Sequence, residues 1–171
     1  MSFIADSEIQ QIAEASAQQA VGFAQGQLGI ILDFSDESIR RLEGSLNRLH
    51  SSLKADRPSE EQVFSIAQML GSYLGEVFRR NHGATWGMVT LNGDRFPGMS
   101  RTSDGLEFWP WGRLRNRIIN GPEDNVWHYY YILMAPKDGG LQPGAPANPN
   151  PSLPTQAQNP KKSFWQRFRG I

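Results

Sequence analysis

The chain has 171 residues, and its 17 Lys/Arg and 17 Asp/Glu give a formal net charge of zero. This length suits one folded domain with a short appendage. The chain contains no cysteine, which excludes disulfides, cysteine nucleophiles and thiolate metal sites, and its three histidines show no ligand spacing. We therefore expect no metal and no cofactor, and the neutral charge gives no reason to expect a nucleic-acid partner.

Charge and composition change together near residue 135. Residues 1–135 contain 12 Lys/Arg and 16 Asp/Glu, whereas residues 136–171 contain five Lys/Arg and one Asp. Seven of the 11 prolines lie in residues 136–160, and such a segment buries too little apolar surface to offset its ordering entropy. We predict a folded domain over 1–135, a disordered linker over 136–160 and a tail over 161–171.

Two helices are predicted in the first third of the chain. The first covers residues 2–25 and ends at Gly26, and residues 28–32 then form a short strand or an extended segment. Ser35 caps the second helix. The apolar stripe of this helix has five members: Ile39, Leu42, Leu46, Leu49 and Leu53.

The third helix has the strongest sequence pattern. Ser59 followed by Gln62 is typical of a capping box at its start, and residues 82–83 end it. Gly71 and Gly75 lie one turn apart within it. They lower its intrinsic helicity, but they let another backbone pack closely against it.

The pattern then changes to the alternation that is typical of strands. Residues 85–101 form a hairpin that turns at Asn92-Gly93, and Pro97 places its second strand at an edge or a bulge. A third strand covers residues 106–109. Two further helices complete the domain, one from Pro110 to Ile119 and one that starts at Pro122. The predicted class is α+β: N-terminal helices, a three-stranded antiparallel meander and C-terminal helices, followed by the linker and the tail.

Glu76 is the one candidate for catalysis, because Arg79 and Arg80 follow it three and four residues later in the third helix. A buried acid here would support proton transfer in a hydrolase-like enzyme. The favoured alternative is an ion pair on the helix surface, since such pairs are common in structural roles. The sequence contains no phosphate-binding loop, dinucleotide fingerprint, nucleophile elbow or zinc-protease motif. We therefore assign no catalytic residue.

Trp109, Trp111, Arg113 and Arg117 form the candidate binding surface. Trp and Arg are enriched at the energetic centres of interfaces, and Arg113 and Arg117 lie one helical turn apart. The alternative places the two tryptophans in the core, because Trp111 also begins an apolar stripe at helical spacing.

The tail combines cations with aromatic residues. As a helix, it would present an apolar arc to a membrane or an acidic partner and keep its charges near headgroups. The alternative is an unstructured, solubilising end. The residues concerned are Lys161, Lys162, Phe164, Trp165, Arg167, Phe168 and Arg169.

Three segments resemble a widespread set of uncharacterised bacterial domains. They are Leu32–Gly44, Tyr73–Trp86 and Phe108–Leu133, and the matching motifs are Leu74-Gly75-Glu76, Gly83 with Trp86, and Pro110 through Asn120-Gly121. The resemblance implies a small cytosolic α+β domain without an established activity, and it supplies no catalytic residues. Some similar small bacterial domains are immunity proteins that neutralise toxins from neighbouring cells.

These features together predict a non-enzymatic protein that binds another protein, with a toxin-neutralising immunity protein as the specific form. The alternative is an adaptor whose tail docks weakly on an anionic membrane, and an enzyme that uses Glu76 comes third. The N-terminus lacks the cationic and apolar segments of a secretory signal. We therefore expect a cytoplasmic protein, which as an adaptor would lie at the inner membrane surface.

Overall fold

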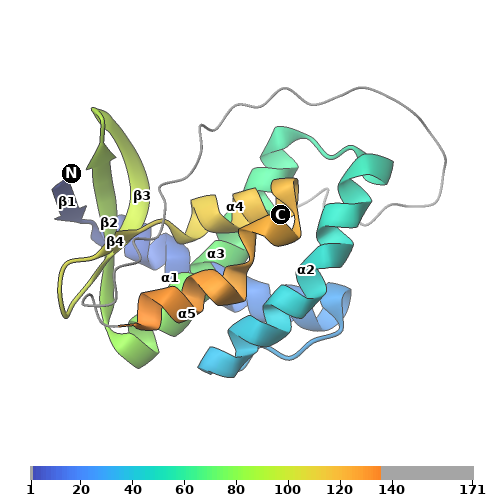
Figure 1. Ribbon diagram of the computed structural model, residues 1–171, viewed down its shortest axis with the longest axis horizontal. Helices are drawn as coiled ribbons and strands as arrows, with labels where there is room; N and C mark the ends of the chain where they lie inside the picture. Colours follow the sequence, from blue (N-terminus) through green and yellow to red (C-terminus); the bar gives the residue numbers. More distant parts are fainter. Residues whose placement is uncertain (1, 136–171) are drawn as a thin grey trace.

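A computed structural model describes residues 2–135, which form five α-helices and a four-stranded antiparallel sheet (Figure 1). The α+β class is confirmed, and the sheet has one strand more than predicted. The predicted linker and tail lie outside the described residues. The elements are β1 (Ser2–Ala5), α1 (Ser7–Phe23), a π-helical turn (Ala24–Leu28), α2 (Asp36–Asp56), α3 (Glu60–His82), β2 (Ala84–Leu91), β3 (Asp94–Arg101), β4 (Glu107–Phe108), α4 (Pro110–Asn120), a 3-10 turn (Pro122–Asp124) and α5 (Val126–Met134).

The additional strand is β1, so the prediction of a helix from residue 2 is wrong for the first residues. Asp6 caps α1, because its carboxylate accepts hydrogen bonds from the backbone N–H groups of Glu8 and Ile9 at 2.9 and 3.1 Å. The four residues before this cap pair antiparallel with β2, where Ala5 lies opposite Gly87. A side chain at Gly87 would collide with the backbone of Ile4, so β1 depends on a partner strand whose paired residues lie 82 to 88 positions away in sequence.

The segment between α1 and α2 also differs from the prediction. Gly26 does not end the helix, which continues as a π-helical turn to Leu28, and Gly29 ends it with a left-handed backbone (φ 66°). Residues 29–33 form neither helix nor strand, so of the two predictions for residues 28–32, a short strand or an extended segment, the strand is absent from this described segment. Gly29 is free of the steric penalty that a side chain would impose at this φ.

The starts of α2 and α3 are confirmed at the predicted caps. The Ser35 hydroxyl accepts a hydrogen bond from the backbone N–H of Ser38 at 3.2 Å. Ser59 and Gln62 form both hydrogen bonds of a capping box, at 3.2 and 2.9 Å. Gly83 ends α3 with a positive φ of 81°. These boundaries depend on interactions within a few residues, which explains why the sequence predicted them.

The hairpin of β2 and β3 is also confirmed, with Asn92 and Gly93 at φ 53° and 92° as a tight turn requires. The outer strand β4 pairs with β3 only at Met99 and Ser100, so Pro97 lies where β3 has no second neighbour. β4 is shorter than the predicted strand over 106–109 because only its two residues form bridges.

Helix α3 lies at the centre of the molecule, with α1 and α4 packed along it and the sheet at one end (Figure 1). Gly71 and Gly75 make this packing possible. A Cβ atom at Gly71 would approach the Trp111 Cα atom to 2.8 Å, and one at Gly75 would approach the Trp86 ring to 2.2 Å. The predicted close approach of another backbone is therefore present at Gly71, where α4 packs against α3, whereas Gly75 makes room for the Trp86 side chain instead.

Candidate functional site

The two predicted surface tryptophans are buried. Trp111 is 9% exposed, and its indole N–H donates to the Ser72 hydroxyl at 2.8 Å. Its ring lies 5.8 Å from that of Trp86, measured between centroids. Trp109 is 5% exposed and immediately precedes α4. The structure thus supports the core interpretation of both residues.

The two predicted surface arginines are also engaged inside the domain. Arg117 is fully buried, and its guanidinium donates to Glu43 at 2.9 Å and to Asn47 at 2.7 Å, both on α2. Arg113 pairs with Asp124 at 2.9 Å and covers the Tyr129 ring at 4.7 Å. The four residues Trp109, Trp111, Arg113 and Arg117 therefore do not present an exposed binding surface. Their partners are distant in sequence, and no local pattern indicates them.

Glu76 is fully buried and paired with both arginines, so the predicted ion pairs are present but the prediction that they lie on the helix surface is wrong for the carboxylate. Its carboxylate accepts hydrogen bonds from Arg79 Nε and Nη2 at 2.8 and 2.9 Å, and from Arg80 Nε at 3.3 Å. The Trp86 indole N–H, from β2, donates a fourth at 3.0 Å. A buried carboxylate without such donors is costly, and removing one partner of a buried pair typically costs about 3–5 kcal/mol. The sheet and α3 together fix this group.

The two arginines that Glu76 fixes line a hollow between α1 and α3. The hollow has a volume of about 670 Å³, and its other lining residues belong to α1: Gln11, Glu14, Ala15 and Gln18. The Arg79 and Arg80 side chains are 28% and 36% exposed, so each has one part bound to the buried acid and another part open to solvent. Sequence reasoning found the triplet of Glu76 and its arginines but not the contribution of α1.

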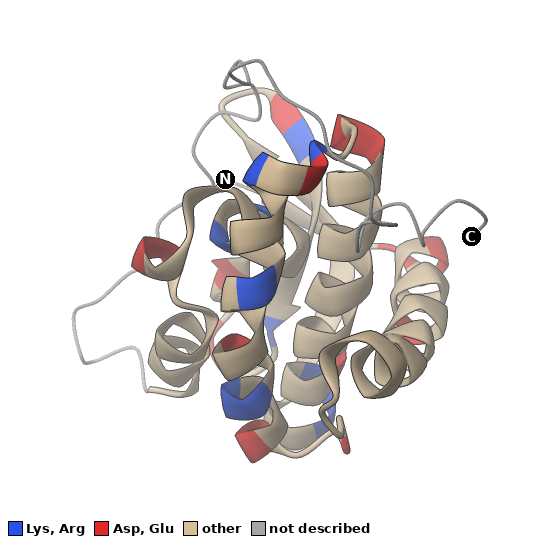
Figure 2. Ribbon diagram, turned by 90° about the vertical axis from the view of Figure 1, so that its right-hand side faces the viewer, with Lys and Arg blue, Asp and Glu red and all other residues tan. Residues whose placement is uncertain are grey.

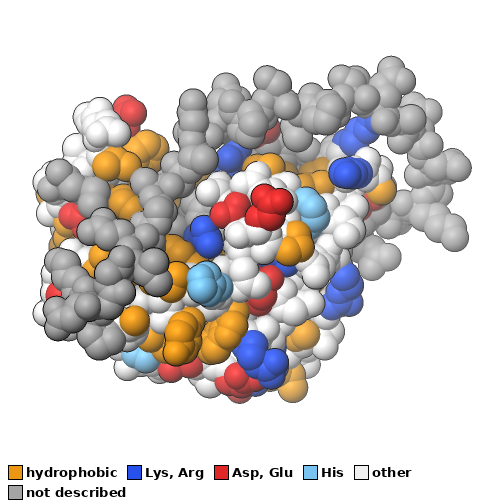
Figure 3. All heavy atoms as spheres, in the orientation of Figure 1, with side chains coloured by type: hydrophobic (Ala, Val, Ile, Leu, Met, Phe, Trp, Pro, Cys, Tyr) orange, Lys and Arg blue, Asp and Glu red, His pale blue; other side chains and the backbone are white. Residues whose placement is uncertain are grey.

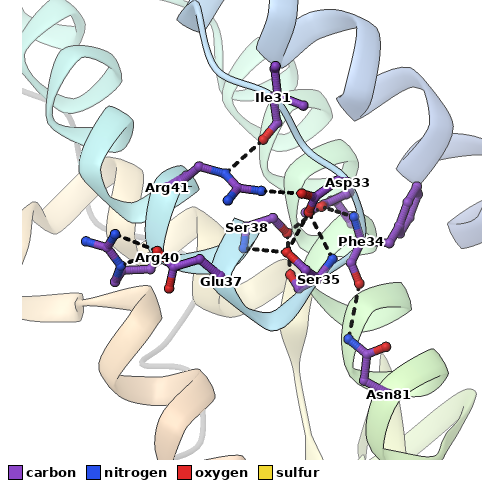
Figure 4. Close-up of polar contacts among 10 residues, drawn as sticks. Ile31, Asp33, Phe34, Ser35, Glu37, Ser38, Arg40, Arg41 and Asn81 are labelled. Atoms are coloured by element: carbon purple, nitrogen blue, oxygen red, sulfur yellow. Dashed lines mark hydrogen bonds and ion pairs between the residues drawn. The ribbon is translucent and has the colours of Figure 1, made fainter.

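Arg80 is held on a second side by Phe34. The Arg80 Cζ atom lies 3.8 Å from the centre of the Phe34 ring, which also packs against Tyr73 at 4.9 Å. Phe34 has a φ of 60°, an unfavourable backbone for a bulky residue, and such strain persists only where surrounding contacts impose it. Here the Phe34 N–H donates to the Tyr73 hydroxyl at 2.8 Å. The Phe34 carbonyl accepts from Asn81 at 3.1 Å (Figure 4).

The loop that carries Phe34 is itself fixed by polar contacts (Figure 4). Asp33 accepts hydrogen bonds from the hydroxyl of Ser35 at 2.5 Å and from Arg41 at 2.7 Å. These contacts, the one with Ser35 first, hold the pKa of Asp33 below its usual value. The charged form of Asp33 therefore stabilises the loop, and the loop places an aromatic ring under the Arg80 guanidinium.

A second polar cluster joins three helices behind this loop. Asp36 accepts hydrogen bonds from the Tyr130 hydroxyl at 2.6 Å, from Asn81 at 2.9 Å and from His82 at 3.0 Å. Burial raises the pKa of Asp36, but these three hydrogen bonds outweigh it and hold the pKa below its usual value. Asp36 on α2 therefore connects this helix to α3 and α5.

Two other faces of the domain have a different character. Charges of both signs alternate along α2, as a solvated helix face requires (Figure 2). Hydrophobic side chains gather over α5, which contains no charged residue and leaves Tyr131 62% exposed (Figure 3). An apolar face offers burial but no charged hydrogen-bond donors, so the hollow at Arg79 and Arg80 is the candidate site.

The hollow combines the guanidinium groups of Arg79 and Arg80 with side chains of α1. Across residues 2–135, no group of three or more His, Cys, Asp or Glu side chains is placed to hold a metal ion. In the same part of the chain, no helix is both long and apolar enough to cross a membrane. The hollow presents planar guanidinium groups, whose fixed forks of N–H donors match carboxylate and phosphate oxygens.

Comparison with protein-family models, with curated proteins and with solved structures finds no match to this chain. The resemblance to bacterial domains therefore depends on its sequence motifs alone. In the structure, the Leu74-Gly75-Glu76 motif and Trp86 meet at the buried carboxylate. The motif residues thus build the support of the candidate site, and its exposed part comes from α1 and the two arginines.

Proposed function

We propose that this protein is a non-enzymatic binding protein that captures an acidic group of a partner protein in the hollow between α1 and α3. The observation that carries the proposal is the fully buried Glu76, which holds Arg79 and Arg80 at the wall of the hollow. Arginines fixed before binding lose little conformational entropy when a ligand arrives. The strained Phe34 beneath Arg80 supports the same role.

The surroundings of Glu76 argue against a role in proton transfer. A general acid or base must reach the proton that it transfers, directly or through one water. Glu76 is buried, and its two oxygens already accept four hydrogen bonds. A toxin that an immunity protein neutralises remains the specific partner class proposed from the sequence resemblance.

Site-specific photocrosslinking in the native cell tests the location of the binding surface. A photoreactive residue at Ala15, which lines the hollow, should form one dominant protein adduct. The same residue at Ser51, exposed on α2, should not form it. Arg80→Gln should abolish the adduct at position 15, whereas Arg95→Gln in the exposed hairpin should preserve it. Equal adducts at both positions, or an adduct unaffected by Arg80→Gln, would contradict the proposal.

Glu76→Gln separates binding from catalysis. If Glu76 only positions the two arginines, the Glu76→Gln protein should lose partner binding and cellular function together. Loss of the cellular phenotype with an intact fold and intact partner binding would instead favour the enzyme interpretation. Circular dichroism and the photocrosslink at position 15 provide the two controls.

The tail gives a second candidate function, a weak membrane-surface contact. Residues 161–171 contain four cations and three aromatic residues, and each cation near an anionic surface contributes about 1 kcal/mol. Full-length protein should sediment with anionic vesicles at low salt and lose this binding at high salt. A 1–160 truncation should stay in solution. Equal sedimentation of both forms would remove the tail from the mechanism.

A further inference from the structure

The arginine hollow already contains a carboxylate from the protein itself. We infer that Glu14 occupies a carboxylate-binding position on Arg79, and that the acidic side chain of a partner enters by replacing Glu14. This inference rests on the proposed function and deepens it, because it names the ligand class of the hollow and the residue that competes with that ligand.

The geometry at Arg79 shows where a ligand carboxylate fits. Arg79 Nη2 donates to Glu76 at 2.9 Å on its buried side and to Glu14 at 3.1 Å across the hollow. The Glu14 oxygen comes from another helix, 65 residues earlier in the chain. An oxygen brought by a partner can therefore occupy the same place without any change in the arginine or in Glu76 behind it.

The two carboxylates differ in how firmly they are held. Glu76 is fully buried and accepts four hydrogen bonds, whereas the Glu14 side chain is 42% exposed. Apart from Arg79, its hydrogen-bond partner among the described residues is the Gln10 amide at 3.0 Å. Ion pairs between solvent-exposed groups are weak because water competes for both partners. Glu14 is therefore the replaceable carboxylate, and Glu76 is the permanent one.

The charge of the hollow favours exchange over simple addition. Arg79 and Arg80 are balanced by Glu14 and Glu76, so an anion that adds without displacing Glu14 gives the cluster an excess negative charge. An incoming carboxylate that replaces Glu14 keeps the balance. The bond lost at Arg79 is re-formed with the ligand, and Glu14 moves into water.

Arg80 has N–H donors that form no hydrogen bond with Glu14. Only its Nε atom is bonded, to Glu76, and its two terminal nitrogens have no hydrogen-bond partner among residues 2–135. Stacking on Phe34 occupies the face of the guanidinium and leaves its N–H edge available. The carboxylate that replaces Glu14 on Arg79 can thus also accept hydrogen bonds from Arg80, which Glu14 does not contact, and the charge of the cluster stays balanced.

Calorimetric titration of the full-length protein with a capped tetraglutamate peptide tests this inference. Glu14→Gln removes the internal competitor and should tighten peptide binding at least tenfold. Glu8→Gln removes the same charge from the same helix at an exposed position away from the hollow, and it should stay within twofold of wild type. Arg80→Gln should weaken binding by Glu14→Gln protein at least fivefold. Inorganic phosphate, the second probe, should show a smaller gain on Glu14→Gln than the peptide does.

Two results would overturn the inference. Peptide affinity that is equal in Glu14→Gln and Glu8→Gln would show that Glu14 does not compete for the site. An equal gain for phosphate and peptide would show a general anion site instead of a carboxylate site. Either result leaves the photocrosslink at position 15 and its dependence on Arg80 unchanged, so failure here is distinct from failure of the proposed function.

Discussion

Arginines of α3 and α4 look alike in sequence and differ completely in the structure. Arg117 on α4 is fully buried and paired with Glu43, whereas Arg80 on α3 is 36% exposed and lines a hollow. Both arginines bind a largely buried carboxylate. The difference is that Glu43 and Asn47 bind two nitrogens of Arg117, whereas Glu76 binds only Arg80 Nε.

A buried acid in this domain therefore pairs with an arginine in two different ways. In the α4 case, acid and arginine pair inside the domain and join α4 to α2, although Arg117 Nη1 is buried without a hydrogen-bond partner among the described residues. In the α3 case, the acid serves as a support that fixes the direction of an arginine whose outer donors remain available. Which of the two occurs depends on what packs against the helix, and three variants test the difference.

The largest expected effect is on the α4 arginine. Arg117→Met leaves Glu43, which is 12% exposed, without its cation and should lower the free energy of unfolding by about 3–5 kcal/mol. Arg80→Met should cost about 1 kcal/mol or less, because Arg79 and Trp86 still neutralise or bind Glu76. Urea unfolding of both variants provides the measurement. Similar losses would contradict the proposed distinction, and Glu43→Gln in the Arg117→Met background should restore part of the stability.

A smaller effect is expected at the glycine that admits Trp86 to the site. Gly75→Ala places a Cβ atom against the Trp86 ring and should destabilise the domain by about 1–3 kcal/mol through overpacking, with Gly75→Leu at or beyond the upper end. Gly44→Ala is the matched control. A Cβ atom at Gly44 in α2 meets nothing within 4 Å, so alanine should stabilise by about 0.5–1 kcal/mol. Thermal unfolding distinguishes the two signs, and a stabilising Gly75→Ala would show that the contact with Trp86 relaxes freely.

The smallest expected effect on stability is at Asp36, which is more exposed than Glu43 or Glu76. Its pKa is lowered in the folded protein, so its charged form contributes stability above the pKa of the unfolded chain. This contribution is lost as the pH falls below about 4 and through the folded pKa. Asp36→Asn should therefore flatten the acid side of a stability profile measured between about pH 5 and pH 2. Tyr130→Phe removes one donor and should flatten it partly. An unchanged slope in Asp36→Asn would assign the acid sensitivity to other carboxylates.

The sequence predicted those elements whose boundaries depend on near neighbours. Ser35 and the pair Ser59 and Gln62 cap helices within three or four residues of themselves, and Asn92-Gly93 closes a turn within two. It did not predict β1, because that strand exists only where Gly87 leaves room for its backbone. The carboxylate of Asp6, which accepts from the amides two and three residues later, was the local signal that the helix starts at Ser7 and not at residue 2.

For the candidate site, the sequence by itself determined that Glu76 and its two arginines share a helix face, because helical spacing fixes neighbours three and four residues apart. The tertiary structure decided what surrounds this triplet. Trp86 buries the carboxylate, Phe34 supports Arg80, and α1 adds Glu14 and the other wall of the hollow. Packing between distant segments also buries Arg117, whose partners Glu43 and Asn47 lie on α2. Burial and the choice of a charged partner depend on packing between distant segments, and the spacing of residues along one helix carries no information about it.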